Sequence, residues 1–130
     1  MAKVTKKQAE KHLKKGAENV TERDLKKVLD KRDEIEKKFK GNGPLGRFVT
    51  DIKLLFAIIQ DYWKGEYRQV TFWSIAAIVA ALLYVLNPLD LIPDMIPIIG
   101  YVDDALIIAV CLAMVEPDLQ NYKDWKIKKG

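Results

Sequence analysis

No lysine or arginine occurs between Arg68 and Lys123, although these residue types fill 22 of the 130 positions. The same stretch holds the two most apolar runs of the chain, residues 70–86 and 105–115, with four aspartates between them. Basic flanks around an apolar segment without cations are typical of membrane proteins, because cationic side chains resist translocation. The sequence therefore predicts an all-α fold: a membrane-associated helical hairpin with a Pro/Asp-rich turn, preceded by amphipathic cytoplasmic helices.

Charge divides the chain into two parts. Residues 1–68 carry a net charge of +7, and residues 69–130 carry −3. We expect residues 1–44 to be a basic, charged helical extension and residues 45–130 to be the membrane helical domain. The positive charges alternate with acidic ones, so the pattern favours a solvated helix face and we expect no nucleic-acid partner.

Within the extension, residues 1–20 are lysine-rich with sparse apolar residues, which predicts a frayed or weakly helical arm. Thr21 and Asp24 have the spacing of a capping box at the start of a helix. Apolar residues then recur every three or four positions, and Gly41 and Pro44 end the pattern. The helix over 21–40 packs on its own domain or, as the weaker alternative, forms a coiled coil with a protein partner.

Residues 45–63 have the pattern of a second amphipathic helix, with Arg47, Asp51, Gln60 and Asp61 on its polar side. Tyr62, Trp63, Tyr67 and Trp73 gather near the first apolar run, and such rings favour the membrane–water boundary. We therefore expect this helix to lie in the interface plane of the lipid bilayer, with a turn at Gly65. A helix on a soluble core would have the same periodicity.

The two apolar runs are short for complete spans. A 17-residue helix over 70–86 rises about 25 Å, and the run over 105–115 rises about 16 Å, whereas a bilayer core measures about 30 Å. A hairpin that enters the membrane and returns fits these lengths best. Pro117 suits the first turn of a new helix, which predicts an amphipathic tail over 117–128 on the basic side. Both termini are then cytoplasmic.

The segment between the runs is the most specific part of the sequence. Residues 84–94 (YVLNPLDLIPD) and 98–104 (IIGYVDD) resemble the core of the YkvA-like family, a bacterial and archaeal domain of unknown function (DUF1232). The resemblance is close from about Trp73 to Leu112 and looser over 45–125, including residues 61–65 (DYWKG); residues 1–44 are not covered. It implies a helical membrane hairpin and no assigned activity.

The Pro/Asp loop over 87–104 admits three interpretations. The favoured one is structural: Asn87, Pro88, Pro93, Pro97 and Gly100 form rigid turns, and the aspartates cap helix N-termini. The second is a divalent-cation site, in which the carboxylates supply hard oxygen ligands. The third is proton or ion passage through a bundle interior. The candidate ligands are Asp90, Asp94, Asp103 and Asp104.

Nothing in the sequence specifies an enzyme or a cofactor. The lone Cys111 lies in an apolar run and has the pattern of a small buried residue, while the only histidine, His12, lies in a distant charged segment. We expect a small non-enzymatic integral membrane protein that anchors or forms homo-oligomers through its hairpin, with residues 21–40 available to a protein partner. The alternatives are a cation-binding or ion-conducting membrane protein and a soluble helical bundle that binds other proteins.

Overall fold

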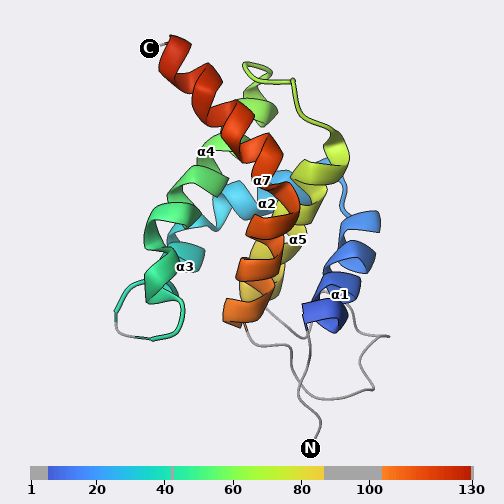
Figure 1. Cartoon of the computed structure of the whole chain (residues 1–130), viewed down its shortest axis with the longest axis vertical. Helices are drawn as coiled ribbons and strands as arrows, with labels where there is room; N and C mark the ends of the chain where they lie inside the picture. The colour runs from blue at the N-terminus through green and yellow to red at the C-terminus, as the bar shows by residue number, and fades with distance from the viewer. Residues whose placement is uncertain (1–5, 42, 87–103, 130) are drawn as a thin grey trace, which may run out of the picture.

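The fold is all α-helical over the residues that the structure describes. The structure is a computed structural model that describes residues 6–41, 43–86 and 104–129 (Figure 1). These ranges hold helices and connecting turns without a strand, so the predicted all-α class is confirmed. The elements are α1 (Lys6–Glu18), α2 (Glu22–Asp30), α3 (Arg32–Lys37), the 3₁₀ turn η1 (Gly46–Phe48), α4 (Val49–Lys64), α5 (Phe72–Leu86) and α7 (Asp104–Lys129).

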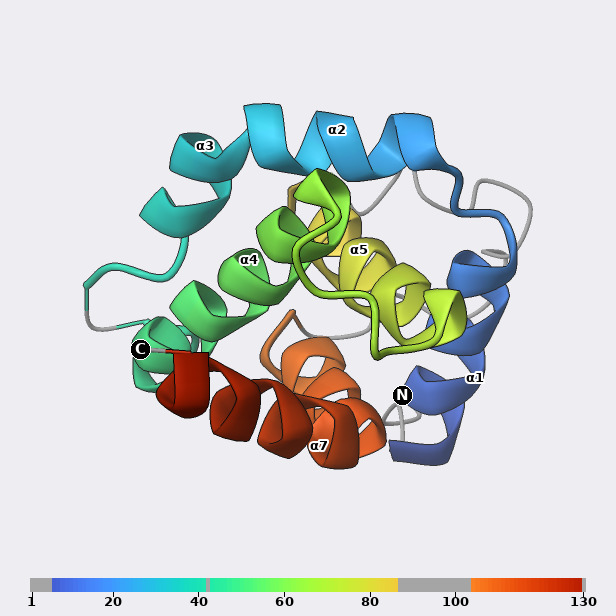
Figure 2. The same cartoon turned by 90° about the horizontal axis from the view of Figure 1, so that it is seen from above.

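Helix α5 lies in the centre of the molecule. Figure 2 shows it surrounded by α1, α2, α3, α4 and α7, and it packs against each of them. Eleven of its 15 residues are buried, on all sides of the helix. A helix that is apolar all round must lie in a protein interior or in lipid. Here other protein side chains enclose α5, whereas the sequence predicts a run exposed to the membrane.

Helix α1 is one of the walls around α5. It packs against both α5 and α7 and buries Ala9, Leu13, Gly16 and Ala17 along one face. Small residues on that face let the backbone of α1 approach the neighbouring helices closely, and the Leu13 side chain packs into the interior. The expectation of a frayed arm over residues 1–20 is therefore wrong for residues 6–18, because four small or apolar residues suffice to bury one stripe of a basic helix.

Helices α2 and α3 form a second wall. The predicted start at Thr21 is confirmed: its backbone N–H donates to Asp24 Oδ2 at 2.9 Å. The expected single helix over 21–40 is interrupted at Lys31, which has φ −100° and ψ 16°. The apolar stripe of this region faces the protein's own core, where Leu25, Val28, Ile35 and Phe39 are buried.

Helix α4 follows the predicted amphipathic segment and ends at the expected turn. Gly65 has φ +80°, a left-handed conformation that favours glycine. The N–H of Gly65 donates to the Tyr62 carbonyl at 3.1 Å, and that of Glu66 donates to the Asp61 carbonyl at 2.9 Å. These bonds satisfy carbonyls that the helix end would otherwise leave unpaired.

Helix α7 is one continuous element, whereas the sequence predicts two helices separated at residue 116. Pro117 lies inside it, and the helix bends along its length (Figures 1 and 2). A proline in a helix interior removes one backbone hydrogen bond and commonly causes a bend. Burial of Val115 and Leu119 on either side of Pro117 holds the helix together across that point.

Helices α5 and α7 run antiparallel, and polar contacts join them. Near the start of α5, the Ser74 hydroxyl donates to the Asp118 carboxylate. Farther along, the Cys111 thiol lies 3.8 Å from the Ala77 carbonyl. At the C-terminal end of α5, the contact comes from a different element. The ammonium of Lys38, which follows α3, donates to the Val85 carbonyl at 3.0 Å and to the Leu86 carbonyl at 3.4 Å. A cation at a helix C-terminus also complements the helix dipole.

Candidate functional site

The predicted aspartate site falls mostly outside the described residues. Asp90, Asp94 and Asp103 lie there, as do the predicted turn residues Asn87, Pro88, Pro93, Pro97 and Gly100. Asp104 is described: it is the first residue of α7, where an acidic side chain complements the helix dipole. Within the described ranges no three His, Cys, Asp or Glu side chains gather as a metal site. The cation site stays a prediction.

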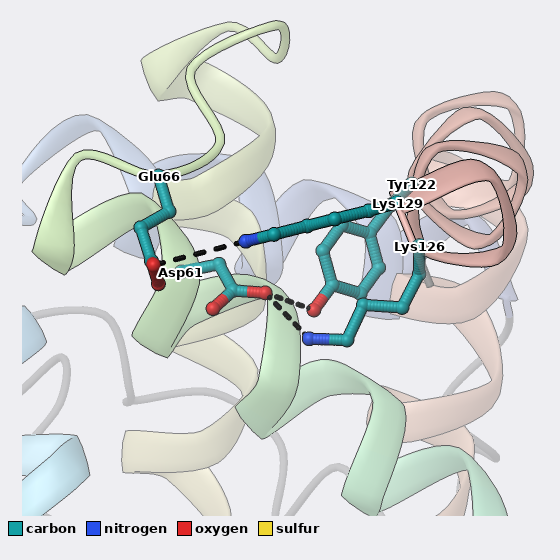
Figure 3. A network of polar contacts seen from close by, with 5 residues as sticks. All are labelled: Asp61, Glu66, Tyr122, Lys126 and Lys129. Carbon is teal, nitrogen blue, oxygen red and sulfur yellow. Dashed lines mark hydrogen bonds and ion pairs between the residues drawn. The ribbon is translucent and has the colours of Figure 1, made fainter.

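The described residues instead bring polar groups together between α4 and α7 (Figure 3). The Tyr122 hydroxyl donates to Asp61 Oδ2 at 2.5 Å, and the Lys126 ammonium donates to the same oxygen at 3.1 Å. Beside them, the Lys129 ammonium lies 3.7 Å from a Glu66 carboxylate oxygen. We call Asp61, Tyr122 and Lys126 the polar clasp, because they join the last turn of α4 to the last part of α7.

The helices determine the geometry of the polar clasp. Asp61 lies three residues after Ile58, so both fall on the buried face of α4. Tyr122 and Lys126 are four residues apart on α7 and therefore project from the same face. Only 9% of the Asp61 surface is exposed, so its carboxylate needs these partners: a buried charge without them is costly. The prediction that Asp61 lies on the polar side of its helix is wrong.

Aromatic rings cover the polar clasp. Tyr67 and Tyr122 have ring centroids 5.1 Å apart, and Trp125 lies 4.9 Å from Tyr67. The Lys129 ammonium lies 4.9 Å from the Trp125 ring, close enough for a cation–π contact. Tyr67 is 1% exposed, so it belongs to the interior and not to the predicted interfacial belt.

The protonation states of the clasp follow from these contacts. Burial by itself raises the pKa of Asp61, but the hydrogen bonds from Tyr122 and Lys126 and the charges of Lys126 and Lys129 outweigh it, so the pKa lies below its ordinary value. Burial, and then the bond to Asp61, raise the pKa of Tyr122 well above its usual range. Asp61 is therefore ionised and Tyr122 protonated at neutral pH.

A second polar contact secures the start of α5. The backbone N–H of Ser74 donates to the Thr71 hydroxyl oxygen at 3.2 Å, and the Ser74 hydroxyl donates to Asp118. Asp118 thus places a carboxylate near the N-terminus of α5, where negative charge is favoured. Burial, and then the nearby charge of Asp118, raise the pKa of Tyr67. Asp118 and Asp61 thus each accept a hydrogen bond from one hydroxyl group, that of Ser74 and that of Tyr122 respectively.

Two residues noted in the sequence lie apart from the polar clasp. Cys111 is fully buried, as predicted, and burial raises the pKa of its thiol to about 12. His12 projects from α1, with its ring 6.5 Å from that of Tyr84. Its buried Nδ1 has no hydrogen-bond partner among the described residues, and burial lowers its pKa.

The junction between α4 and α5 exposes a group of aromatic side chains. Trp63, Phe72 and Trp73 are 40%, 38% and 41% exposed. The Tyr62 ring lies 6.3 Å from that of Phe72, and the Arg68 guanidinium lies 4.3 Å from the Tyr62 ring centroid. We call Tyr62, Trp63, Phe72 and Trp73 the aromatic corner. The sequence identified three of its four residues as interfacial.

Sequence reasoning missed the polar clasp. Lys126 and Tyr122 were recognised only as parts of an amphipathic tail. The available signal was the spacing: Tyr122 and Lys126 differ by four positions, and Asp61 continues the Ile58 face. The partner of that face, however, is 61 residues away from Asp61, and no local pattern specifies such a contact.

Comparisons with known proteins identify the central segment. Residues 74–110 match the family described as "Protein of unknown function (DUF1232)". The chain is also similar to the "Uncharacterized membrane protein YkvA" of Bacillus subtilis (strain 168), at 29% identity over 80 residues; these cover 62% of this chain and 76% of the relative. No solved structure matches the chain significantly.

Proposed function

Because the chain carries a domain of the YkvA-like DUF1232 family, as its motif predicts, we propose that it is a non-enzymatic, membrane-associated helical module. The observation that carries the membrane part is the similarity to a protein that is itself described as a membrane protein. Helix α7 agrees with it, because this helix is long and apolar enough to cross a membrane by length and composition. The basic flanks favour cytoplasmic termini.

The packing of the described residues favours attachment to the membrane surface over insertion of the hairpin. Helix α5 has 15 residues and rises about 22 Å, less than the roughly 30 Å of a bilayer core. It is already enclosed by five other helices of the protein. Lipid would have to replace those contacts before α5 could insert, and lipid tails offer no better apolar surroundings than the side chains they would displace.

The chemistry of the polar groups favours a structural role over catalysis. A general acid or base works best with a pKa near the operating pH. In the clasp, the pKa of Asp61 is lowered and that of Tyr122 is raised, so both shifts move away from neutrality. The raised pKa of Cys111 likewise keeps its thiol protonated. Groups held in this way stabilise the bundle, and none of them changes its protonation state near neutral pH.

Cell fractionation tests the proposal. Membranes from cells that produce the full chain are washed with buffer, with high salt and with alkaline carbonate, and the chain is followed by immunoblot. We expect it to sediment with membranes in buffer and to be released by carbonate, as a surface-bound protein is. Complete recovery in the soluble fraction before any wash would overturn membrane association.

The second candidate is the integral form, in which the hairpin is inserted in the bilayer. Helix α7 favours it, since only 44% of its 18-residue apolar stretch is buried inside the protein. The same fractionation separates the two forms, because an inserted hairpin resists carbonate. Retention in the carbonate pellet would therefore replace surface attachment with insertion.

A further inference from the structure

Exposed apolar side chains occur where α4 ends and α5 begins, two helix ends that the Tyr62–Phe72 ring contact joins. Among the described residues, five large apolar side chains are exposed: Val49, Trp63, Phe72, Trp73 and Ile127. The three aromatic ones all belong to the aromatic corner. Single exposed apolar residues are ordinary, but a cluster marks a contact surface. Tryptophan in particular, with an apolar body and a polar N–H, favours the boundary between lipid and water.

Cationic side chains accompany this cluster. Arg68 stacks on Tyr62, and Lys64 follows Trp63 at the end of α4. Arg68 and Lys64 are both exposed, and Glu66 between them is paired with Lys129. The corner therefore presents rings and positive charge together, which is the combination that binds to anionic lipid surfaces.

The end of α7 extends the positive charge on the same side. The Lys129–Glu66 ion pair brings the last turn of α7 to the loop that follows α4, and Figure 1 shows these two segments at one end of the molecule. That turn carries Lys126, Lys128 and Lys129, and between them Ile127 is 78% exposed. The opposite ends of α5 and α7, at Leu86 and Asp104, carry no basic residue in their terminal turns.

We propose that the aromatic corner is the membrane-contact surface of this protein and that it binds anionic phospholipid. Trp63, Phe72 and Trp73 enter the headgroup region, while Arg68, Lys64 and, at the end of α7, Lys128 lie against the lipid phosphates. This inference rests on the proposed membrane association and specifies which surface makes it. In this orientation α5 stays enclosed, because only its first residues reach the lipid.

Vesicle binding tests the assignment. The purified full chain is mixed with vesicles and sedimented. One set of vesicles contains phosphatidylglycerol and phosphatidylcholine, and the other contains phosphatidylcholine alone. We expect Trp63→Ser/Trp73→Ser to bind the anionic vesicles at least about tenfold more weakly. Arg68→Gln should weaken binding roughly fivefold at low salt and much less at high salt. The control, Val49→Ser, removes an exposed apolar side chain at the start of α4, away from the corner and from the end of α7, and should bind the vesicles as the wild type does.

Brominated acyl chains provide a second readout that does not depend on a variant's folding. Tryptophan fluorescence of the wild-type chain should be quenched by bromine near the headgroups more than by bromine near the bilayer centre. The assignment of the aromatic corner would be overturned if the chain bound vesicles without quenching of its tryptophan and if Trp63→Ser/Trp73→Ser bound with wild-type affinity. Membrane association itself would then still hold. Equal binding to neutral and anionic vesicles would overturn the lipid class. If the wild-type chain stayed in the supernatant with every type of vesicle, the aromatic corner would not be a lipid-binding surface. Cell fractionation then tests the proposed membrane association separately.

Discussion

Asp61 is the residue on which the joint between α4 and α7 depends most. It is a nearly buried carboxylate whose partners come from a helix far along the chain. Hydrogen bonds to a charged group contribute about 1.5–3 kcal/mol each, and the loss of one partner leaves the other group buried and unsatisfied. Removal of any one member of the polar clasp therefore costs more than the single contact that it breaks.

Replacing Asp61 with asparagine keeps an acceptor for Tyr122 but removes the charge that Lys126 faces. We expect Asp61→Asn to lower the free energy of unfolding by about 1–3 kcal/mol, measured by urea denaturation followed by circular dichroism. Asp124→Asn is the matched control, because Asp124 is an exposed carboxylate on α7. Its effect should stay within about 0.5 kcal/mol.

Tyr122→Phe removes the hydroxyl group that donates to the Asp61 carboxylate in the polar clasp. Alone it should cost about 1–2 kcal/mol, because the Asp61 carboxylate loses a buried donor. Combined with Asp61→Ala, which removes the acceptor of this bond, the loss should be smaller than the losses of Tyr122→Phe and Asp61→Ala added together. Strict additivity in this double-mutant cycle would contradict a direct bond between the two side chains.

The pH dependence of stability follows from the lowered pKa of Asp61. The folded-state pKa lies below the unfolded value of about 3.9. The unfolded chain therefore binds the proton more tightly, and the clasp's contribution is complete above that pH and is lost as the pH falls through the folded pKa. Urea titrations between pH 7 and pH 2.5 should show a smaller acid loss in Asp61→Asn than in wild type. Parallel curves would contradict the assignment.

At the scale of elements, α5 is held at both ends by side chains from other helices. Asp118 reaches its first turn through Ser74, and Lys38 reaches its last carbonyls. Each contact supplies the charge that the helix dipole favours at that end. Helix α5 has no charged residue in its own first or last turn. Side chains from other helices therefore supply the charges that its two ends favour.

Lys38→Met tests the contact at the C-terminal end of α5. The substitution keeps an unbranched side chain but removes the donor, and we expect a loss of about 0.3–1 kcal/mol. Lys37→Met removes an exposed ammonium one position earlier and serves as the control. Thermal unfolding should show a lower Tm for Lys38→Met than for Lys37→Met. Equal melting temperatures would argue against the Lys38 contact.

Helix positions were largely predictable, while helix partners were not. Periodicity and capping residues predicted helices near 21–40, 45–63 and 70–86, since these signals are local. The continuity of α7 through Pro117 was missed, because packing of Val115 and Leu119 outweighs a local penalty of about 3 kcal/mol. The polar clasp was missed because it joins residues far apart in sequence. The aromatic corner was largely found, since three of its residues stand out by type alone.

At the scale of the whole molecule, the central question is what surrounds α5. An all-apolar run predicts burial in lipid or in protein equally well, because both surroundings are apolar. The composition of α1 decides between them only once the fold is known: its stripe of Ala9, Leu13, Gly16 and Ala17 covers α5 and α7. The described protein thus encloses its most apolar helix and presents a small aromatic and basic surface to its surroundings.

Photo-cross-linking in membranes tests this arrangement most directly. A diazirine amino acid of leucine size replaces either Leu82, which is fully buried on α5, or Trp73 of the aromatic corner. After irradiation of membrane-bound protein, mass spectrometry distinguishes lipid adducts from cross-links within the chain. The enclosed bundle predicts lipid adducts at position 73 and cross-links to neighbouring helices at position 82. Abundant lipid adducts at position 82 would contradict it and would show that lipid surrounds α5.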